Sequence, residues 1–178
     1  MKRTPDQALE ALRTQIGAWA KGRAKPDLRV FVYPPEWEAL MLLRLPEFAK
    51  QCSAQGEPVE LVDVGRAFLK ELSDRNGLIE RLSSLDRAEL LDDLGWTGTS
   101  CLKKLMRSPL NTGDVCRILI NTGALATFVS YSAVANELTG PVDPAVPATV
   151  LAFPGEGDER SLNLLRLRVD TNYRIPRI

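Results

Sequence analysis

The chain has 178 residues, of which 44% are hydrophobic and 26% charged, and these are the proportions of one ordinary globular domain. Its 23 basic and 23 acidic side chains cancel, so the net charge gives no reason to expect a polyanionic partner. The sequence contains no histidine, which excludes Ser-His-Asp and Cys-His catalysis and the usual zinc hydrolases.

The N-terminal segment predicts an amphipathic helix. Thr4 can cap it, Pro5 suits the first helical position, and Gln7 completes a capping box. Apolar residues then recur at helical spacing as far as Trp19, and Gly22 fits the end of the helix.

A short strand and a second helix are expected next. Leu28–Tyr33 has the composition of a strand, which Pro34-Pro35 ends. Glu36 and Glu38 then fall in the first turn of a helix, where the helix dipole favours carboxylates. Pro46 lies inside this helical pattern and predicts a kink or a restart.

The middle of the chain predicts a strand followed by a helical insertion. Pro58–Val64 reads as the strand. Residues 65–112 are too long for a plain crossover and contain several short helical patterns. Asp86 and Glu89 make a capping box, and Gly95 predicts the end of a short helix.

Two further strands and a helix follow. Val115–Ile120 is the third predicted strand, and Phe128–Leu138 reads as a helix. Ala148–Phe153 is the fourth strand, which is expected to stop at a tight turn at Pro154-Gly155.

The C-terminal tail contains a strict alternation of apolar and basic residues. Leu165–Val169 predicts a fifth strand with arginines on its wet face, or one arm of a hairpin that turns at residues 170–172. A helix through Leu162, Leu165 and Val169 is the competing interpretation.

Strands that alternate with helices predict an α/β fold. We expect one domain, residues 1–178, with a mainly parallel sheet of about four to five strands and helices on both faces. The helical insertion, at about residues 65–112, falls between the second and third strands. The predicted core consists of Leu9, Leu12, Val30, Val32, Leu61, Val62, Ile118, Ile120, Val150 and Leu151.

Candidate ligand or partner residues lie at the carboxyl ends of the predicted strands, where open α/β sheets usually bind their ligands. They are Tyr33, Glu36, Asp63, Asn121, Thr122, Gly155 and Glu156. Carboxylates at this edge can hold a cation such as Mg²⁺, which keeps a metal- or nucleotide-dependent enzyme open as one alternative. The structural alternative is that these residues cap helices and shape turns.

No phosphate-binding motif supports an enzyme. The sequence has no G-x-x-x-x-G-K-[ST], and Arg160 stands where a third glycine would complete G-x-G-x-x-G after Gly155 and Gly157. A conventional ATPase or a Rossmann dehydrogenase is therefore not expected. No residue is assigned a catalytic or metal-binding role, and no cofactor is expected.

The two ends of the chain are basic and its middle is acidic. Residues 1–29 carry seven Lys or Arg against three acids, and residues 160–178 carry five Arg against Asp170. This is either an ordinary solvated surface or a basic patch to which Arg166, Arg168 and Arg177 contribute. A nucleic-acid-binding module is a second alternative, with only weak binding expected of a neutral chain.

The C-terminal residues resemble a known family. An apolar strand, then Phe-Pro-Gly-Glu, then a Leu-rich segment and finally Asn172-Tyr173-Arg174 is similar to the signature of the BrxB family, a component of bacterial BREX phage-defence systems. The resemblance is sharpest over Gly123–Ile178 and looser over Arg29–Val64. In the family a second aromatic often follows the Asn-Tyr pair, whereas Arg174 follows here, which indicates a divergent member.

The resemblance implies a non-catalytic interaction component of an antiphage assembly. Its expected partners are a PglZ-type protein and other defence-system proteins. In Asn172-Tyr173-Arg174, the arginine either binds a phosphate or a partner carboxylate, or pairs within the chain with an acid such as Glu156 while the tyrosine packs on the core.

The compartment follows from the cysteines and the N-terminus. Cys52, Cys101 and Cys116 are odd in number and form no C-x-x-C pair, which favours a reducing environment. The first residues lack the apolar segment of a signal peptide, and no apolar run has the length of a membrane span. A cytoplasmic protein without a membrane partner is expected.

Overall fold

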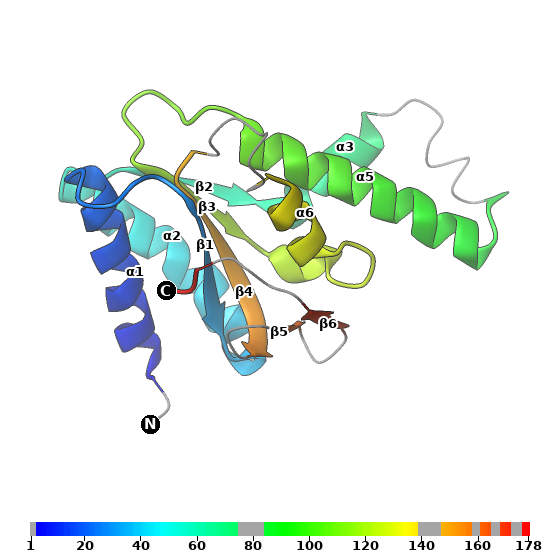
Figure 1. Ribbon diagram of the computed structural model, residues 1–178, viewed down its shortest axis with the longest axis horizontal. Coiled ribbons are helices and arrows are strands. Elements are labelled where there is room, and N and C mark those ends of the chain that lie inside the picture. The colour runs from blue at the N-terminus through cyan, green and yellow to red at the C-terminus, as the bar shows by residue number, and fades with distance from the viewer. Residues whose placement is uncertain (1–2, 75–83, 139–146, 158–160, 165–167, 172–175) are drawn as a thin grey trace.

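A parallel β-sheet runs through the middle of the molecule (Figure 1). The computed structural model describes residues 3–74, 84–138, 147–157, 161–164, 168–171 and 176–178. Strands β1 (Leu28–Tyr33), β2 (Val59–Asp63), β3 (Cys116–Ile120) and β4 (Thr149–Gly157) are parallel and lie in the order β2-β3-β4-β1. The predicted α/β fold with a mainly parallel sheet is confirmed.

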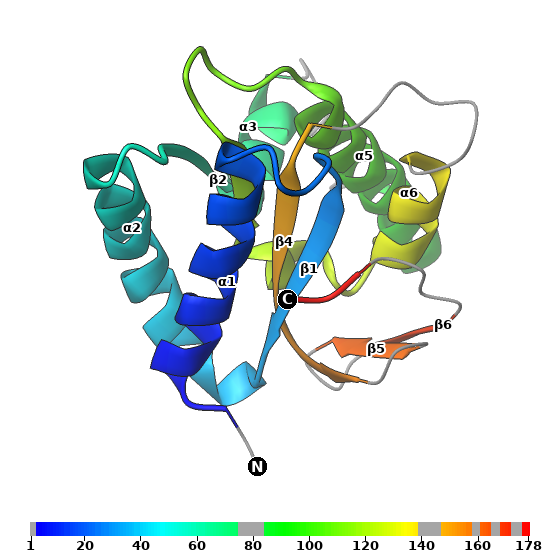
Figure 2. The ribbon, with the colours of Figure 1, turned by 60° about the vertical axis from the view of Figure 1, so that its left-hand side comes forward.

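Helices cover both faces of this sheet, as Figure 2 shows. On one face lie α1 (Pro5–Ala20) and α2 (Glu38–Ala54), and on the other lie α3 (Val64–Ser73), α5 (Arg87–Arg107) and α6 (Tyr131–Leu138). The connection from β1 to β2 crosses the sheet in the opposite direction from the connections β2 to β3 and β3 to β4. Right-handed crossovers therefore place α2 on one face and the later helices on the other.

The core is divided into two clusters by the sheet. Successive side chains of a strand point to opposite faces. Ile118 and Val150 accordingly pack under α1 and α2, whereas Leu119 and Leu151 pack under α3, α5 and α6. The expectation that the predicted core residues are buried together was wrong, because the sheet separates them into two clusters. Four of the predicted members are only partly buried, namely Leu9, Val32, Leu61 and Val62.

Local signals placed α1 correctly. The Gln7 amide donates to Thr4 Oγ1 at 3.3 Å, and the Thr4 amide donates to Gln7 Oε1 at 2.9 Å, so the predicted capping box is present. Gly22 follows the end of the helix with a φ of 62°, in the left-handed region that glycine tolerates.

The second helix begins later than predicted and passes through Pro46. A 3-10 turn, η1 (Pro35–Trp37), precedes α2, which therefore begins at Glu38. The helix then continues through Pro46 without a break, so the predicted restart does not occur. Pro46 deprives the helix of one hydrogen bond, while the neighbouring Leu45 and Phe48 stay buried against the sheet and hold the helix together.

The predicted helix end at Gly95 was also wrong, because α5 runs unbroken from its Asp86 N-cap to Arg107. A Cβ atom at Gly95 would lie 3.0 Å from the backbone oxygen of Phe128, and one at Gly98 would lie 2.7 Å from a methyl group of Val129. These glycines let α5 approach the segment before α6 closely, and they do not end a helix.

The C-terminal part of the chain was predicted least well. β4 continues past Phe153 to Gly157 and pairs antiparallel with β5 (Ser161–Leu164), which pairs antiparallel with β6 (Arg168–Thr171). Of the expected strand Leu165–Val169, residues 168–169 lie in β6, and residues 165–167 lie outside the described residues. The predicted hairpin turn is contradicted at residues 170–171, which belong to β6, and the competing helix is contradicted because Leu162 lies in β5 and Val169 in β6. Pairing with a neighbouring strand extends β4 where the local sequence indicated a turn.

The last residues cover the outer edge of β1. The Val30 amide donates to the Pro176 carbonyl at 3.0 Å, and the Ile178 amide donates to the Val30 carbonyl at 3.0 Å. Val30 and Arg177 form a parallel bridge. Among the residues that the structure describes, no helix has the length and apolarity needed to cross a membrane.

A buried ion pair joins β2, β3 and the end of α5. Arg117 of β3 is 3% exposed, and its Nε donates to Glu60 Oε2 of β2 at 2.6 Å. Its other nitrogens donate to the carbonyls of Leu105, Ser108 and Pro109. Arg117 thus satisfies both a carboxylate and the carbonyl groups at the end of a helix, which have no partners within the helix.

We predict that Arg117→Met lowers the free energy of unfolding by about 3–5 kcal/mol, because it leaves the Glu60 carboxylate and several carbonyls without a buried donor. Urea unfolding measures the loss. The matched control is Arg44→Met, which removes an exposed ion pair with Asp6 and should cost about 0–1 kcal/mol. Equal losses in the two variants would contradict the structural role of Arg117.

Candidate functional site

The carboxyl ends of the parallel strands bring several of the predicted site residues to one edge of the sheet. β2 ends at Asp63, Asn121 and Thr122 follow β3, β4 passes through Gly155, and β1 ends at Tyr33. The strand order places the Asp63 and Asn121 positions next to each other, and it places Tyr33 beside β4. The hydrogen bonds at each position show how these side chains are used.

Asp63 and Asn121 form a compact cap at the start of α3. Asp63 Oδ1 accepts a hydrogen bond from the Arg66 amide at 2.9 Å and another from Asn121 Nδ2 at 3.1 Å. Asn121 adopts a left-handed conformation with φ 56° and ψ 34°, which asparagine tolerates better than most residues. A Cβ atom at Gly65 would lie 2.6 Å from Asn121 Nδ2, so glycine makes room for this amide.

Thr122 is fully buried and links β3 to β4. Its hydroxyl donates to the Ala152 carbonyl at 2.6 Å, and its own carbonyl accepts a hydrogen bond from the Tyr131 hydroxyl at 2.5 Å. The Tyr131 ring meets the Phe153 ring edge to face, with centroids 4.5 Å apart. Tyr131 was not among the predicted site residues, since its position in the sequence gives no sign that it reaches back to Thr122.

Tyr33 contacts Glu38 and not Glu36. Its hydroxyl donates to Glu38 Oε2 at 2.5 Å, whereas Glu36 lies on the exposed side of η1. Burial raises the pKa of Tyr33, and the neighbouring Glu38 carboxylate raises it further. Burial also raises the pKa of Glu38, while the hydrogen bond from Tyr33 lowers it in part. The 3-10 turn Pro35–Trp37 places Glu38 at the start of α2, where its carboxylate reaches the Tyr33 hydroxyl.

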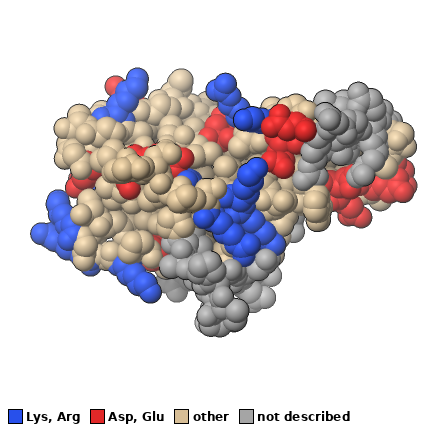
Figure 3. Space-filling model, turned by 90° about the horizontal axis from the view of Figure 1, so that it is seen from above, with Lys and Arg blue, Asp and Glu red and all other residues tan. Residues whose placement is uncertain are grey.

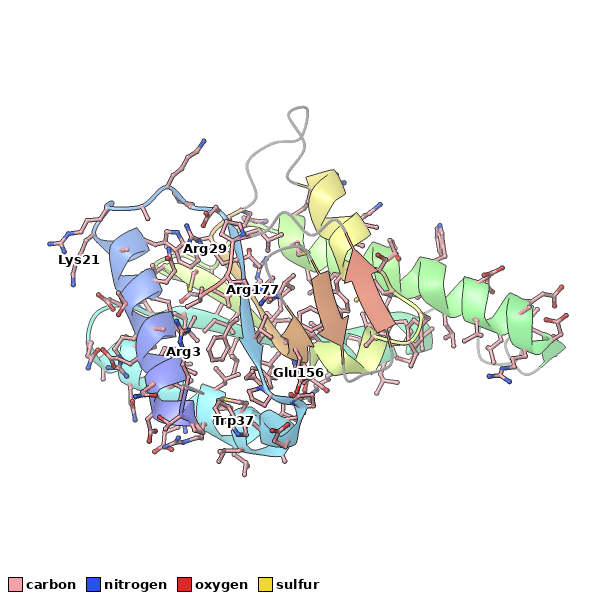
Figure 4. All side chains as sticks on the ribbon, turned by 60° about the horizontal axis from the view of Figure 1, so that its bottom comes forward. Arg3, Lys21, Arg29, Trp37, Glu156 and Arg177 are labelled. Carbon is pink, nitrogen blue, oxygen red and sulfur yellow. The ribbon has the colours of Figure 1, made fainter. Side chains whose placement is uncertain are left out.

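Gly155 and Glu156 belong to the antiparallel part of β4. Gly155 is buried and lies opposite Leu164, whereas Glu156 is exposed and lies opposite Asn163. Figure 4 shows Glu156 and Trp37 at the same edge of the sheet. These residues therefore do not form the tight turn that was expected here.

The remaining candidates fall mostly outside the described residues. Asn172, Tyr173, Arg174 and Arg166 all lie there, and Arg168 is placed in β6 by its backbone. Arg177 lies beside Val30 of β1, close to the position of Arg29 in Figure 4. Arg29 pairs with Asp27 at 3.0 Å. Both interpretations of Asn172-Tyr173-Arg174 therefore remain predictions.

The cysteines and acids that the structure describes show no arrangement for metal binding. Within the described ranges, no group of three or more Cys, Asp or Glu side chains is placed to hold a metal ion. Cys52, Cys101 and Cys116 are free and buried, and burial raises the pKa of each thiol. A thiol with a raised pKa stays protonated at neutral pH and is a poor nucleophile.

Most polar groups described at this edge are already used within the fold. Asp63 caps a helix, Asn121 shapes the turn after β3, and Thr122 ties two strands together. The structural interpretation of the candidate residues is thus directly supported by their hydrogen bonds. Comparison of the chain with protein-family models, with curated proteins and with solved structures found no match.

We expect Asp63→Ala to lower the free energy of unfolding by about 1 kcal/mol, because α3 loses its N-cap acceptor. Asp63→Asn keeps an acceptor oxygen at this position and should lose less. Chemical denaturation of both variants measures the difference, and amide hydrogen exchange at Arg66 locates it. A more stable Asp63→Ala protein would contradict the capping role and would point to a strained functional acid.

The Tyr33–Glu38 pair predicts a pH dependence of stability. The pKa of Glu38 is raised in the folded protein above its ordinary value of 4.5, so the folded state binds the proton more tightly. The contribution of Glu38 is therefore full below that ordinary value and is lost as the pH rises through the raised pKa. Glu38→Gln should accordingly gain stability relative to wild type over this pH range.

Thermal melting of wild type, Glu38→Gln and Tyr33→Phe at a series of pH values tests this expectation. Tyr33→Phe removes the donor that partly lowers the pKa of Glu38, so its loss of stability should extend to higher pH. Glu36→Gln controls for the removal of a charge from the neighbouring exposed position. A constant difference between Glu38→Gln and wild type at all pH values would show that Glu38 does not titrate as described.

Proposed function

We propose that this chain is a non-catalytic interaction component of a bacterial BREX-like antiphage assembly, acting in the cytoplasm with a PglZ-type partner. The observation that carries the proposal is the resemblance of residues Gly123–Ile178 to the BrxB family. In the fold these residues include β4, the antiparallel β5 and β6, and the segment that covers β1. The resembling segment therefore contributes a central part of the sheet as well as its end.

The chemistry of the strand ends supports a binding role over a catalytic one. Asp63, Asn121 and Thr122 are committed to hydrogen bonds that hold α3, β3 and β4 in place. A general acid or base must be within reach of a substrate proton, and these groups are engaged with the protein. The proposal therefore assigns the biological role to the surface of the domain.

The surface carries several large apolar side chains that a binding partner can cover. Leu43 is 76% exposed, and Leu40 lies one turn before it on α2. The other exposed members are Leu69 on α3 and Leu91 and Trp96 on α5. Single exposed apolar residues are common, so this observation supports the proposal without carrying it.

The distribution of charge favours a protein partner over a nucleic acid. Acidic side chains gather at the end of the molecule where α5 begins (Figure 3). They belong to Asp86, Glu89, Asp92 and Asp93. These carboxylates oppose a polyanion at that end, and the net charge of the whole chain is zero.

The test is co-expression of the tagged chain with the PglZ-type protein of the same genome. We expect the two proteins to co-elute in size-exclusion chromatography at moderate salt, and deletion of the gene to reduce phage resistance. An unrelated α/β protein with the same tag is the control. Failure to co-elute, together with unchanged resistance after deletion, would contradict the proposal.

A DNA titration separates the nucleic-acid alternative. We expect only weak binding at low salt, which disappears at moderate salt because few phosphates are neutralised. Tight binding of duplex DNA that persists at moderate salt would replace the proposed role with that of a nucleic-acid-binding module.

A further inference from the structure

The two outer edges of the parallel sheet differ in whether another described segment pairs with them. The edge of β1 is covered by the segment 176–178, through the two backbone hydrogen bonds at Val30. β2 forms the opposite edge and pairs with β3 on its inner side. In the part of the chain that the structure describes, no second strand pairs with β2. An open edge presents backbone groups on which a further strand can form.

A shallow groove of about 840 Å³ runs along this open edge between β2 and α3. Its apolar lining includes Leu61, Val62 and Leu69, and the Leu69 side chain is 66% exposed. Leu61 and Val62 are neighbours in β2 and face opposite sides of the sheet. Both side chains are only partly buried. The groove therefore offers apolar contacts beside an unpaired strand.

The α3 side of the groove is basic. Arg66 and Lys70 stand one turn apart on α3, and both are exposed. Neither cation forms an ion pair with the acids of the described ranges. The acid nearest to them in the groove lining, Asp63, is engaged as the N-cap of α3. The α3 side of the groove therefore carries two positive charges that a ligand with carboxylates would neutralise.

We propose that the β2 edge binds an extended, acidic segment of a partner protein by strand addition. The backbone of the segment would pair with the outer side of β2. Its carboxylates would meet Arg66 and Lys70 on the α3 face of the sheet, and its apolar side chains, which alternate with them, would contact Leu61 on the other face. The same chain already accepts an extended segment at β1, which shows that strand addition is compatible with this sheet.

The charge of the groove argues against a second copy of this chain as the occupant. Antiparallel pairing of β2 with β2 of a second copy places both α3 helices on the same face of a continuous sheet. Arg66 and Lys70 of the two copies would then approach each other, and like charges oppose such pairing. An acidic segment meets no such opposition.

The inference concerns a surface and a peptide chemistry, and it does not depend on which defence protein supplies the segment. The probe is a short fluorescein-labelled peptide that alternates valine and glutamate, titrated with the full-length protein and followed by fluorescence anisotropy. The first matched peptide carries lysine in place of glutamate. The second keeps the side chains but is N-methylated at alternate residues, which removes its capacity to pair as a strand.

We expect only the unmethylated acidic peptide to bind. Arg66→Glu/Lys70→Glu should weaken its binding about tenfold or more, because two favourable ion pairs become repulsive. Lys25→Glu/Lys50→Glu, which reverses two exposed charges elsewhere, should leave binding unchanged. Amide exchange should slow in residues 59–63 when the peptide is present.

Four results would overturn the inference. They are absence of binding, equal binding of the lysine or the methylated peptide, insensitivity to Arg66→Glu/Lys70→Glu, and a concentration-dependent dimer formed through β2 in place of peptide binding. Co-elution with the PglZ-type protein without peptide binding would leave the proposed function standing and remove this inference. Peptide binding without co-elution, together with unchanged phage resistance after deletion of the gene, would leave this inference standing and contradict the proposed function.

Discussion

The fold depends on the pairing of β4 with strands on both of its sides. Among the described strands, β1 joins the parallel sheet only through β4, which also connects it to β3 and β2. Residues Val150 to Phe153 of β4 are buried on both faces of the sheet. Because each cluster of the core takes alternate side chains from this strand, loss of β4 would remove buried residues from both clusters and would detach β1 from β2 and β3.

Buried polar groups then fix neighbouring elements relative to one another. Arg117 ties β3 to Glu60 and to the carbonyls at the end of α5, and Thr122 ties the turn after β3 to Ala152. Such groups are costly to bury without partners, so they specify one arrangement of strands and helices. The residue types that suggested a ligand site stabilise the domain instead. A binding role is therefore proposed for the surface of the domain and not for the strand ends.

The two outer edges of the parallel sheet differ in what pairs with them. The edge of β1 is covered by the chain itself, whereas β2 pairs with no second strand among the described residues and lies beside the basic side of α3. A sheet whose β2 edge pairs with no second described strand suits the proposed role of binding another protein, because backbone pairing gives affinity and side-chain charge gives selectivity. The proposed defence role and the β2 groove are thus compatible, while each stands on a separate observation.

The sequence by itself determined the α/β class, the bounds of β1, β2 and β3 to within one residue, and the capping boxes at Thr4 and Asp86. These features depend on apolar runs and on hydrogen bonds between residues at most four positions apart, so local patterns encode them. Only the tertiary structure decided that α5 passes through Gly95, that Arg117 is buried, and that Tyr33 selects Glu38. It also extended β4 beyond Phe153. Gly95 depends on the Phe128 carbonyl, Arg117 on Glu60, and the extension of β4 on β5, all of which folding brings near. Tyr33 and Glu38 are only five positions apart, and the 3-10 turn between them decides that they meet. Contacts between residues distant in sequence are fixed by packing, which no single segment of the sequence specifies.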